Sequence, residues 1–193
     1  MSNLKIRVAT PMDSHKILEV YKPYILNTAI TFEYDIPTLE DFTNRIVSTL
    51  KRYPYIVAIE DNQIVGYAYA SEFKNRKAYD WAVETSIYIK QGFHGKGYGK
   101  KLYQVLEDIL KKQNILNVNA CISCTNTEDE HLTNDSIYFH QRLGYSIVGK
   151  FHSCGYKFNK WFDMVWLEKS LNEHTVPVKD VIPFNQISNN INF

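Results

Sequence analysis

The residues of this chain best suited to chemistry gather around a glycine-rich turn. Residues 91–100 read Gln-Gly-Phe-His-Gly-Lys-Gly-Tyr-Gly-Lys, with four glycines between positions 92 and 99. Glycine lets the backbone turn tightly and lets a ligand approach its N–H groups. Residues 101–112 carry apolar side chains at helical spacing, so the turn leads into a helix whose first N–H groups are unpaired and partially positive. Such a turn is suited to an anion, above all a phosphate.

Three phosphate-binding patterns share this outline, and two of them do not fit. A Walker A loop needs Gly-Lys-Ser/Thr at the helix start, and the chain has no such run. The dinucleotide pattern G-x-G-x-x-G also fails, because the glycines here stand at 95, 97 and 99. The remaining pattern is Gln/Arg-x-x-Gly-x-Gly/Ala, which residues 94–99 match if His94 replaces the leading residue. A merely flexible turn with a coincidental glycine run is the alternative.

Two side chains near this turn could move protons. Residues 83–89 alternate as a strand, which places Glu84 on the face opposite Ile87 and Ile89. An amine with a lysine-like pKa of about 10.4 must lose a proton before it attacks, and a carboxylate can accept that proton. His140 lies one helical turn beyond Ser136 and could donate a proton to a leaving group. The alternatives are an exposed strand carboxylate without a task and a packed or surface histidine.

The composition fits one soluble domain and excludes several classes of protein. The 193 residues are 45% hydrophobic and 22% charged, with a formal net charge of +1. That charge gives no electrostatic case for nucleic acid or an anionic membrane as the main partner. The polar start, residues 1–5, is not a signal peptide, so we expect a cytoplasmic protein. The three cysteines include a Cys121–Cys124 pair at redox spacing, but this pair ends a strand instead of starting a helix, and no zinc-like ligand pairs accompany it.

The first third of the chain predicts helices around the start of a sheet. Residues 4–9 alternate as a strand, and a helix follows with an apolar face. Pro23 is expected to break this helix and leave a second short one over residues 24–27. Residues 28–33 are expected to be irregular or extended. Thr38 and Asp41 resemble a capping box for the next helix, whose inward side chains are expected to be Leu39, Phe42, Ile46 and Leu50.

The rest of the chain predicts a mixed sheet. Residues 55–60 and 64–70 form a hairpin, and the strand over 83–89 with its turn and helix comes next. Residues 114–122 return as a strand parallel to it. A long acidic loop, a short helix ended by Gly144, and a last hairpin over 145–151 and 161–167 follow. In all, about seven strands are expected. Residues 172–193 lack periodicity and are expected to form a tail on the surface of the domain or of a partner.

This order of elements resembles the GNAT acetyltransferase fold, an α/β fold with a mixed central sheet flanked by helices and a phosphate-binding turn after its fourth strand. The motifs that carry the resemblance fall in family order. They include the glycine turn, residues 54–58, 66–70, 78–81 and 84–89, Ser136 to Tyr145, and Gly155-Tyr156-Lys157-Phe158 with Trp161-Phe162-Asp163. Together they look like the phosphinothricin N-acetyltransferase branch over roughly residues 4–171. We therefore expect a GNAT domain over 1–171 and a C-terminal tail over 172–193.

The resemblance implies transfer of an acetyl group from acetyl-CoA to the amine of a small amino-acid-like acceptor, such as phosphinothricin or methionine sulfoximine, by direct attack and without a metal. It implies a homodimer, Glu84 as general base and His140 as general acid. The residues that it places against acetyl-CoA are Ile87, Tyr88, Ile89, His94, Gly95, Lys96, Gly97, Tyr98, Gly99, Lys100, Asn134 and Ser136. Those that it places against the acceptor are Phe32, Glu33, Tyr79 and Tyr156.

Two departures from the branch and three alternatives stay open. His94-Gly95 stands where the pattern usually has Gln-Arg or Gln-Gly, and the loop around 127–133 is longer than usual, so the acceptor could differ from phosphinothricin. Within the fold, the alternative is an enzyme that acetylates a protein N-terminus or a lysine. A CoA-binding module without catalysis is the alternative from another class. A nucleotide-binding, kinase-like protein is the third, weakened by the missing Lys-Ser/Thr pair.

Overall fold

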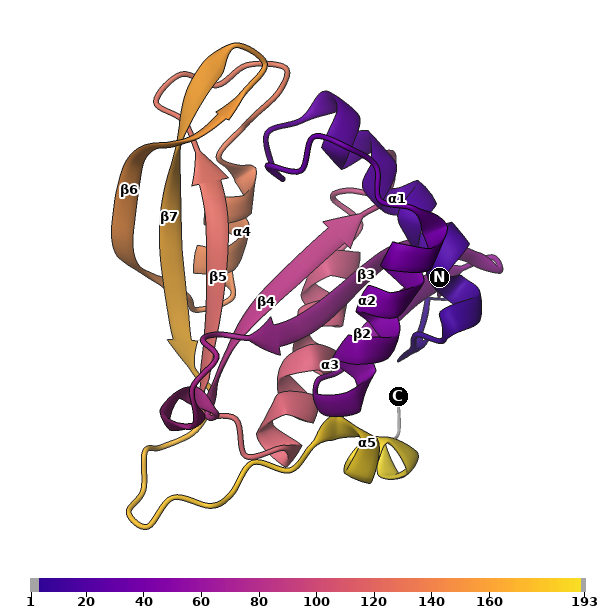
Figure 1. Cartoon of the computed structure of the whole chain (residues 1–193), viewed down its shortest axis with the longest axis vertical. Coiled ribbons are helices and arrows are strands. Elements are labelled where there is room, and N and C mark those ends of the chain that lie inside the picture. The colour runs from indigo at the N-terminus through magenta and orange to yellow at the C-terminus, as the bar shows by residue number, and fades with distance from the viewer. Residues whose placement is uncertain (1–3, 192–193) are drawn as a thin grey trace.

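The chain folds around one seven-stranded sheet with helices on both faces (Figure 1). This computed structural model describes residues 4–191. The strand order is β1-β2-β3-β4-β5-β7-β6, so the last strand of the chain lies between β5 and β6. All neighbouring strands are antiparallel except β4 and β5, which are parallel and are joined by α3. Within residues 4–191, no helix is long and apolar enough to cross a membrane.

The bounds of the elements follow the chain. The strands are β1 (Lys5–Val8), β2 (Tyr55–Glu60), β3 (Gln63–Glu72), β4 (Ala82–Ile89), β5 (Asn117–Cys124), β6 (Ser146–Lys157) and β7 (Lys160–Ser170). The α-helices are α1 (Ser14–Asn27), α2 (Leu39–Arg52), α3 (Tyr98–Lys112), α4 (Asp135–Arg142) and α5 (Phe184–Ile187). Short 3-10 turns are η1 (Pro11–Asp13), η2 (Lys77–Tyr79) and η3 (Ser188–Asn190).

Two apolar cores lie on opposite faces of the sheet. One core joins α1 and α2 to β2 and β3, and it contains a cluster of stacked tyrosine rings. The other joins α3 to the opposite face and is the larger of the two. The apolar stripe predicted for residues 102–110 is therefore confirmed as the buried face of α3. Eight of the fourteen tyrosines are buried, and they divide between the two cores.

Two predictions about the helices are wrong. The prediction of a break at Pro23 fails, because α1 continues through this residue to Asn27. Pro23 removes one hydrogen bond to the carbonyl of Glu19, which lies on the exposed side, and burial of the opposite side holds the helix together. Leu39 is 45% exposed instead of facing inward, because it is the first residue of α2. The capping role of Thr38 is confirmed, since its side chain accepts a hydrogen bond from the N–H of Asp41.

The sheet forks between β4 and β5. These strands pair over only three positions, Ala82 to Glu84 against Asn117 to Asn119, and then diverge (Figure 1). The side chain of Thr85 donates to the carbonyl of Asn119 at 3.1 Å where the pairing ends. Beyond this point the edge of β4 that faces β5 is not paired with it. A fork of this kind leaves backbone groups of β4 available to an extended ligand.

The segment after β7 runs beneath the sheet and docks against the ends of two helices. Gln113, which follows α3, donates its amide to the carbonyls of Arg52 and Ile182, each at 2.8 Å. Trp81 donates to the carbonyl of Lys179 at 2.7 Å. Phe184 of α5 is 2% exposed and belongs to the larger core. The domain boundary after residue 171 stays a prediction. The described part of the tail packs on the domain itself, one of the two places expected for it.

Replacing Phe184 by alanine is expected to lower the free energy of unfolding by about 3 kcal/mol, the lower end of the range for a buried phenylalanine. The smaller value applies because a terminal segment can detach before the whole domain unfolds. The melting temperature should fall by roughly 6–12 °C. Val176→Ala is the matched control, since Val176 is 97% exposed in the same segment and should change stability little. Equal melting curves for the two variants would show that α5 does not stabilise the domain.

Candidate active site

The glycine turn lies at the open end of the fork and leads directly into α3. Gly92, Gly95 and Gly97 have φ angles of +83°, +76° and +81°, the left-handed region that favours glycine. A Cβ atom built at any of the three would meet no heavy atom within 4 Å. The space beside this backbone is therefore open, and the partially positive start of α3 adjoins it. The turn fits the pyrophosphate of a nucleotide-derived donor.

Gly99 and Tyr98 of the turn pack against neighbouring elements, whereas its lysines lie at the surface. A Cβ on Gly99 would lie 3.1 Å from the ring of Phe139, so glycine at this position lets α3 approach α4 closely. Tyr98 is buried and donates to the carboxylate of Glu60. The ammonium of Lys96 lies 4.4 Å from the ring centre of Phe93, and Lys100 is exposed.

His94 is connected to α1 and to the end of β4. The hydroxyl of Tyr24 donates to the carbonyl of Ile89 and lies 2.9 Å from Nε2 of His94. Because the tyrosine proton is used on the carbonyl, Nε2 of His94 acts as the donor to the tyrosine oxygen. Partial burial lowers the pKa of His94, while Asp135 acts in the opposite direction. His94 therefore ties the turn to the fork, in addition to standing at the first position of the motif.

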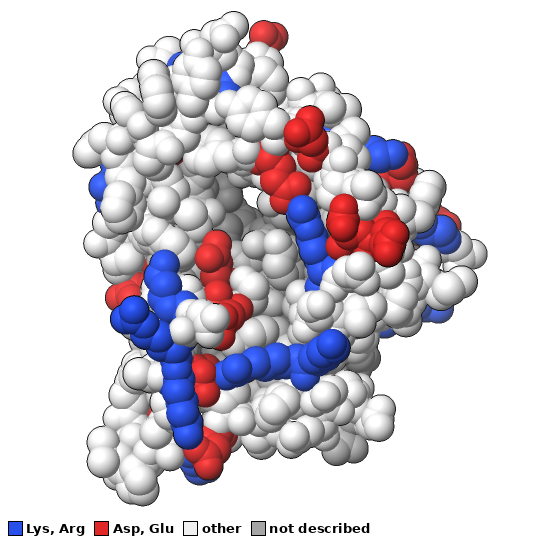
Figure 2. Space-filling model, viewed as in Figure 1, with Lys and Arg blue, Asp and Glu red and all other residues white. Residues whose placement is uncertain are grey.

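Glu84 lies at the base of the fork, on the face of the sheet that α1 and α2 cover. Strand register places Ser71 of β3 beside it, with Tyr69 and Ser86 next along the same face. On the other side, Asn119 is its partner, and Cys121 comes two residues later on that face. Burial raises the pKa of Glu84, and the positive charge of Lys74 acts against this rise. The space-filling view of this side shows a hollow in the middle, with acidic and basic side chains on its rim (Figure 2).

Cys121 does not offer a nucleophile in this arrangement. Burial and the neighbouring charge of Glu84 raise the pKa of its thiol to about 12. At neutral pH the thiol stays protonated, and a thiol attacks poorly compared with a thiolate. All three cysteines, Cys121, Cys124 and Cys154, are free thiols in the structure. Among residues 4–191, no three His, Cys, Asp or Glu side chains are grouped as metal ligands.

His140 is buried behind the fork, with 3% of its surface exposed. Its Nδ1 donates to the carbonyl of Ser136 at 2.7 Å, so Nε2 of the neutral ring accepts from the hydroxyl of Tyr103, also at 2.7 Å. Tyr103 in turn lies 3.2 Å from the hydroxyl of Thr85, the neighbour of Glu84. Burial lowers the pKa of His140, which keeps the ring neutral near pH 7. The route from His140 to the fork therefore passes through Tyr103.

The residues outside the glycine turn that are predicted to contact the cofactor lie in two places, at the end of β4 and around the start of α4. Ile87, Tyr88 and Ile89 follow the point where β4 and β5 part. Asn134 precedes α4, but its side chain is held by the backbone of Thr125, donating to the carbonyl at 3.0 Å and accepting from the N–H at 3.2 Å. The backbone of Asn134 is engaged as well, since its N–H donates to the carboxylate of Glu128 at 2.9 Å and its carbonyl accepts from the N–H of Ile137 at 3.0 Å. The roles of these residues stay predictions.

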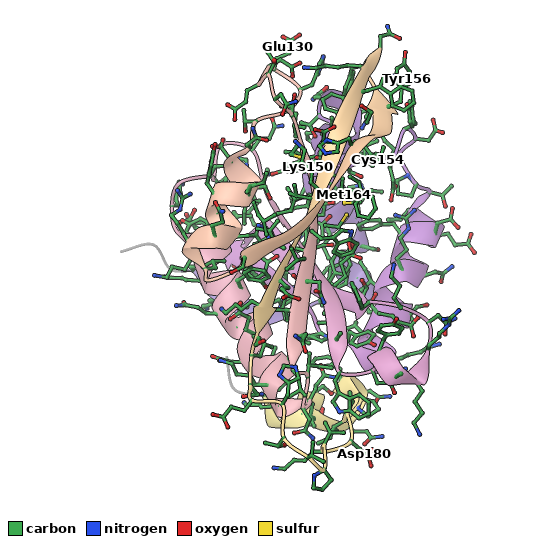
Figure 3. All side chains as sticks on the ribbon, turned by 90° about the vertical axis from the view of Figure 1, so that its left-hand side faces the viewer. Glu130, Lys150, Cys154, Tyr156, Met164 and Asp180 are labelled. Atoms are coloured by element: carbon green, nitrogen blue, oxygen red, sulfur yellow. The ribbon has the colours of Figure 1, made fainter. Side chains whose placement is uncertain are left out.

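The four predicted acceptor residues lie in three places. Phe32 and Glu33 lie on the connection between α1 and α2, and Glu33 pairs with Arg45 at 2.6 Å. Tyr79 packs on Phe73, with ring centres 6.0 Å apart, and is 43% exposed. Tyr156 lies toward the tip of the β6–β7 hairpin (Figure 3), and its ring lies 5.0 Å from that of the exposed Trp161 at an interplanar angle of 55°. No described contact brings Tyr79 or Tyr156 to Glu84.

Sequence reasoning missed the charges and hydroxyls that surround Glu84. Lys74 follows β3, and its charge reaches Glu84 because β3 and β4 are adjacent and antiparallel. Its ammonium also lies 5.9 Å from the ring centre of Trp166 on β7. Arg45 of α2 acts on the same face through Tyr69 and Glu33. The predicted hairpin and the strand after it could have indicated Tyr69 and Ser71 by alternation, but no local pattern indicates Lys74 or Arg45.

A forked sheet, an open glycine turn at its mouth and a partly buried carboxylate at its base define a group transferase that binds a phosphate-bearing donor. The family-wide sequence model for the acetyltransferase (GNAT) domain matches residues 6–166 of this chain. The chain belongs to this family, and the predicted fold is confirmed. It is an acetyl-CoA-dependent N-acetyltransferase.

Relatives and solved structures agree with this assignment over nearly the whole chain. Phosphinothricin N-acetyltransferase of Streptomyces viridochromogenes is 29% identical, over 95% of this chain and 96% of that protein. L-amino acid N-acyltransferase MnaT of Escherichia coli is 30% identical, over 90% and 98%. The structure of a GNAT superfamily phosphinothricin acetyltransferase from Sinorhizobium meliloti in complex with acetyl-CoA superposes with a TM-score of 0.84 at 31% identity, over 94% of this chain and 96% of that one.

Proposed function

We propose that this N-acetyltransferase acts on the primary amine of a small amino-acid-like acceptor, of the kind represented by phosphinothricin or methionine sulfoximine, with Glu84 as the general base. The observation that carries the proposal is the position of Glu84, which lies partly buried at the base of the fork in reach of the charge of Lys74. The activities for which the relatives are named, phosphinothricin N-acetyltransferase and L-amino acid N-acyltransferase, support this acceptor class.

The proposed reaction needs only groups that the chain supplies. Acetyl-CoA lies with its pyrophosphate on residues 94–99 and its thioester at the fork. Glu84, directly or through water, removes a proton from the ammonium of the acceptor, and the amine attacks the thioester carbon. The C–N bond forms, the C–S bond breaks and the thiolate of CoA leaves. A thiol with a cysteine-like pKa of about 8.5 leaves without much help. The second proton, which the nitrogen sheds as the amide forms, is proposed to reach the thiolate through solvent. The neutral His140 accepts at Nε2 from Tyr103, so its proposed role is to orient that hydroxyl and not to supply a proton itself.

The covered site favours a small acceptor over a protein tail. The connection between α1 and α2 contacts the β6–β7 hairpin, so it bridges the two sides of the fork. An enzyme for protein N-termini or lysines would need a groove that admits an extended peptide.

We propose also a cytoplasmic homodimer. Strand β6 is an edge strand, and its exposed Ile147, Val148 and Phe151 support an interface with a second copy.

A panel of free amino acids, their analogues and short peptides, with thiol release measured in the presence of acetyl-CoA, tests the proposal. We expect turnover with at least one free amino acid or analogue and little with peptides. The reaction should proceed equally well in EDTA. Good turnover with peptides alone would replace the proposal by the protein acetyltransferase. Binding of acetyl-CoA without turnover of any amine would favour the non-catalytic module.

A further inference from the structure

Residues 28–34, which we call the roof segment, form the start of the connection between α1 and α2 and lie against the β6–β7 hairpin (Figure 1). The roof segment belongs to the half of the molecule built on β1–β4, whereas the hairpin belongs to the half built on β5–β7. The fork separates these halves at the candidate active site. Contacts of the roof segment therefore set how the two halves meet above the acceptor.

Lys157 at the end of β6 is the central contact. Its side chain is buried, with 4% of the residue exposed, and its ammonium donates to the carbonyls of Ile25, Thr28 and Thr31 at 2.7, 2.8 and 2.9 Å. These three bonds use all three N–H groups, which offsets the cost of burying the charge. Ile25 lies in the last turn of α1, where carbonyls lack partners within the helix and a cation is favourable.

Gly155, two residues before Lys157, receives the ring of Phe32. A Cβ built on Gly155 would lie 2.2 Å from this ring, so no larger residue fits without moving it. The strand bulges just before this point, and Asp163 holds the bulge by accepting from the N–H of Ser153 at 2.8 Å and pairing with Lys150 at 2.8 Å. The glycine, lysine and aspartate of the motif around residues 155–163 thus have one shared task.

The acidic loop after β5 adds contacts to the same segment. The N–H of Ala29 donates to the carbonyl of His131 at 2.9 Å, and Nδ1 of His131 lies 3.0 Å from the carbonyl of Asn27. Ala29, Leu132 and Phe162 form a small buried cluster on which Phe32 packs. Phe162 alternates with Met164 and Trp166 along β7, and Trp166 is paired with Cys121 beside Glu84. The roof segment is therefore continuous with the wall of the candidate site.

We propose that Lys157 is a positioning residue that fixes the roof segment over the acceptor, and that it acts through Phe32 and Glu33 without touching the reacting atoms. The inference rests on the proposed function, since it concerns the acceptor side of the same site. Glu33 follows Phe32 and is joined to Arg45 of α2, so the two residues of the segment that the resemblance assigns to the acceptor are both held by contacts within the protein. The glycine turn is joined to α1 through Tyr24 and His94, and none of its residues contacts Lys157 or Phe32 among the described hydrogen bonds.

The first test compares Lys157→Met with Lys51→Met. Methionine keeps the length of the side chain but removes its charge and its three donors. Lys51 is an exposed lysine in the last turn of α2 and serves as the control. For Lys157→Met we expect kcat/KM for the amine to fall by about 10- to 100-fold, mostly through KM, because displaced positioning groups have effects of this size. The Kd for acetyl-CoA should stay unchanged, and Lys51→Met should behave as wild type.

The second test disturbs the same contact without removing Lys157. Gly155→Ala forces the ring of Phe32 to move, whereas Gly149→Ala on the same strand meets nothing within 4 Å. We expect Gly155→Ala to raise the KM for the amine and Gly149→Ala to leave it unchanged. Amide hydrogen exchange, which requires no activity, should be faster at residues 28–34 in Lys157→Met and Gly155→Ala than in the two controls.

The outcomes separate this proposal from the proposed function. If the wild type acetylates no small amine, the function is wrong, and exchange at residues 28–34 alone decides whether Lys157 holds the segment. If the wild type is active and Lys157→Met and Gly155→Ala only melt earlier, with an unchanged KM for the amine, Lys157 is merely structural and the proposal fails. Equal losses of affinity for the amine and for acetyl-CoA would also overturn it, because the effect would not be confined to the acceptor side.

Discussion

Replacing Glu84 by glutamine is expected to lower kcat by about 100- to 10,000-fold, the usual contribution of a general base. Glutamine keeps the shape of the side chain and part of its hydrogen bonding, but it cannot accept a proton. The affinity for acetyl-CoA should hardly change, since Glu84 lies at the base of the fork and the glycine turn at its mouth. Steady-state rates with the best amine of the panel, together with calorimetric titration of CoA, measure both quantities.

The pH dependence of kcat/KM in the wild type and in Glu84→Gln tests the same assignment. Burial raises the pKa of Glu84, so the wild type should lose kcat/KM on acidification at a pH above the usual titration range of a glutamate. Glu84→Gln should lack this acidic limb, and its rate should rise toward alkaline pH, where solvent deprotonates more of the amine. Glu72→Gln, an exposed carboxylate at the end of the adjacent strand, is the control and should keep the wild-type profile. A wild-type rate for Glu84→Gln across the pH range would remove the base assignment.

Replacing Gly97 by valine is expected to weaken the binding of acetyl-CoA by about 100-fold or more, because two hydrogen bonds to a charged phosphate are worth roughly 1.5 kcal/mol each. The space beside Gly97 is open in the structure, and a valine side chain would fill the place where the phosphate approaches the backbone. Its φ of +81° is also strained for a branched residue, which would displace the first turn of α3. Calorimetric titration with CoA measures the loss of affinity.

Gly144→Val separates the two causes. Gly144 has a φ of +91° at the end of α4, so the variant introduces the same backbone strain far from the turn. We expect both variants to lose stability in urea, but only Gly97→Val to lose affinity for CoA. If Gly144→Val weakens CoA binding to the same extent, strain alone explains the effect. If Gly97→Val binds CoA as the wild type does, the turn is not the phosphate site.

Local patterns in the sequence determined the units of this fold. The alternation of residues 55–70 and 83–89, and the helical spacing after the glycine turn, predicted β2, β3, β4 and α3 at nearly their observed bounds. They could do so because side-chain alternation and helical periodicity depend only on neighbours along the chain. The glycine turn was recognisable for the same reason, since left-handed backbone and close approach of a ligand both require glycine.

Tertiary packing overrode local preference at other places. Local rules predict that a proline such as Pro23 breaks a helix, yet α1 continues through it because the buried side of the helix packs on the core. Residues 172–193 lack periodicity, but the part of them that is described is fixed by single contacts of Trp81, Gln113 and Phe184 with distant elements. Such contacts join residues far apart in sequence, so they leave no period to detect.

The candidate site shows the same division. Glu84 and the glycine turn could be predicted together from the sequence, because they lie on one strand-turn-helix unit. The partners that define their chemistry come from elsewhere: Lys74 beside Glu84, Tyr103 between His140 and Thr85, and Lys157 beneath the roof segment. Strand register, the angle of the fork and the burial of a charge arise only when the sheet is assembled. The sequence by itself determined which groups could react, and the tertiary structure decided which charges and hydrogen bonds surround them, since electrostatic and packing energies depend on distances in space and not on separation along the chain.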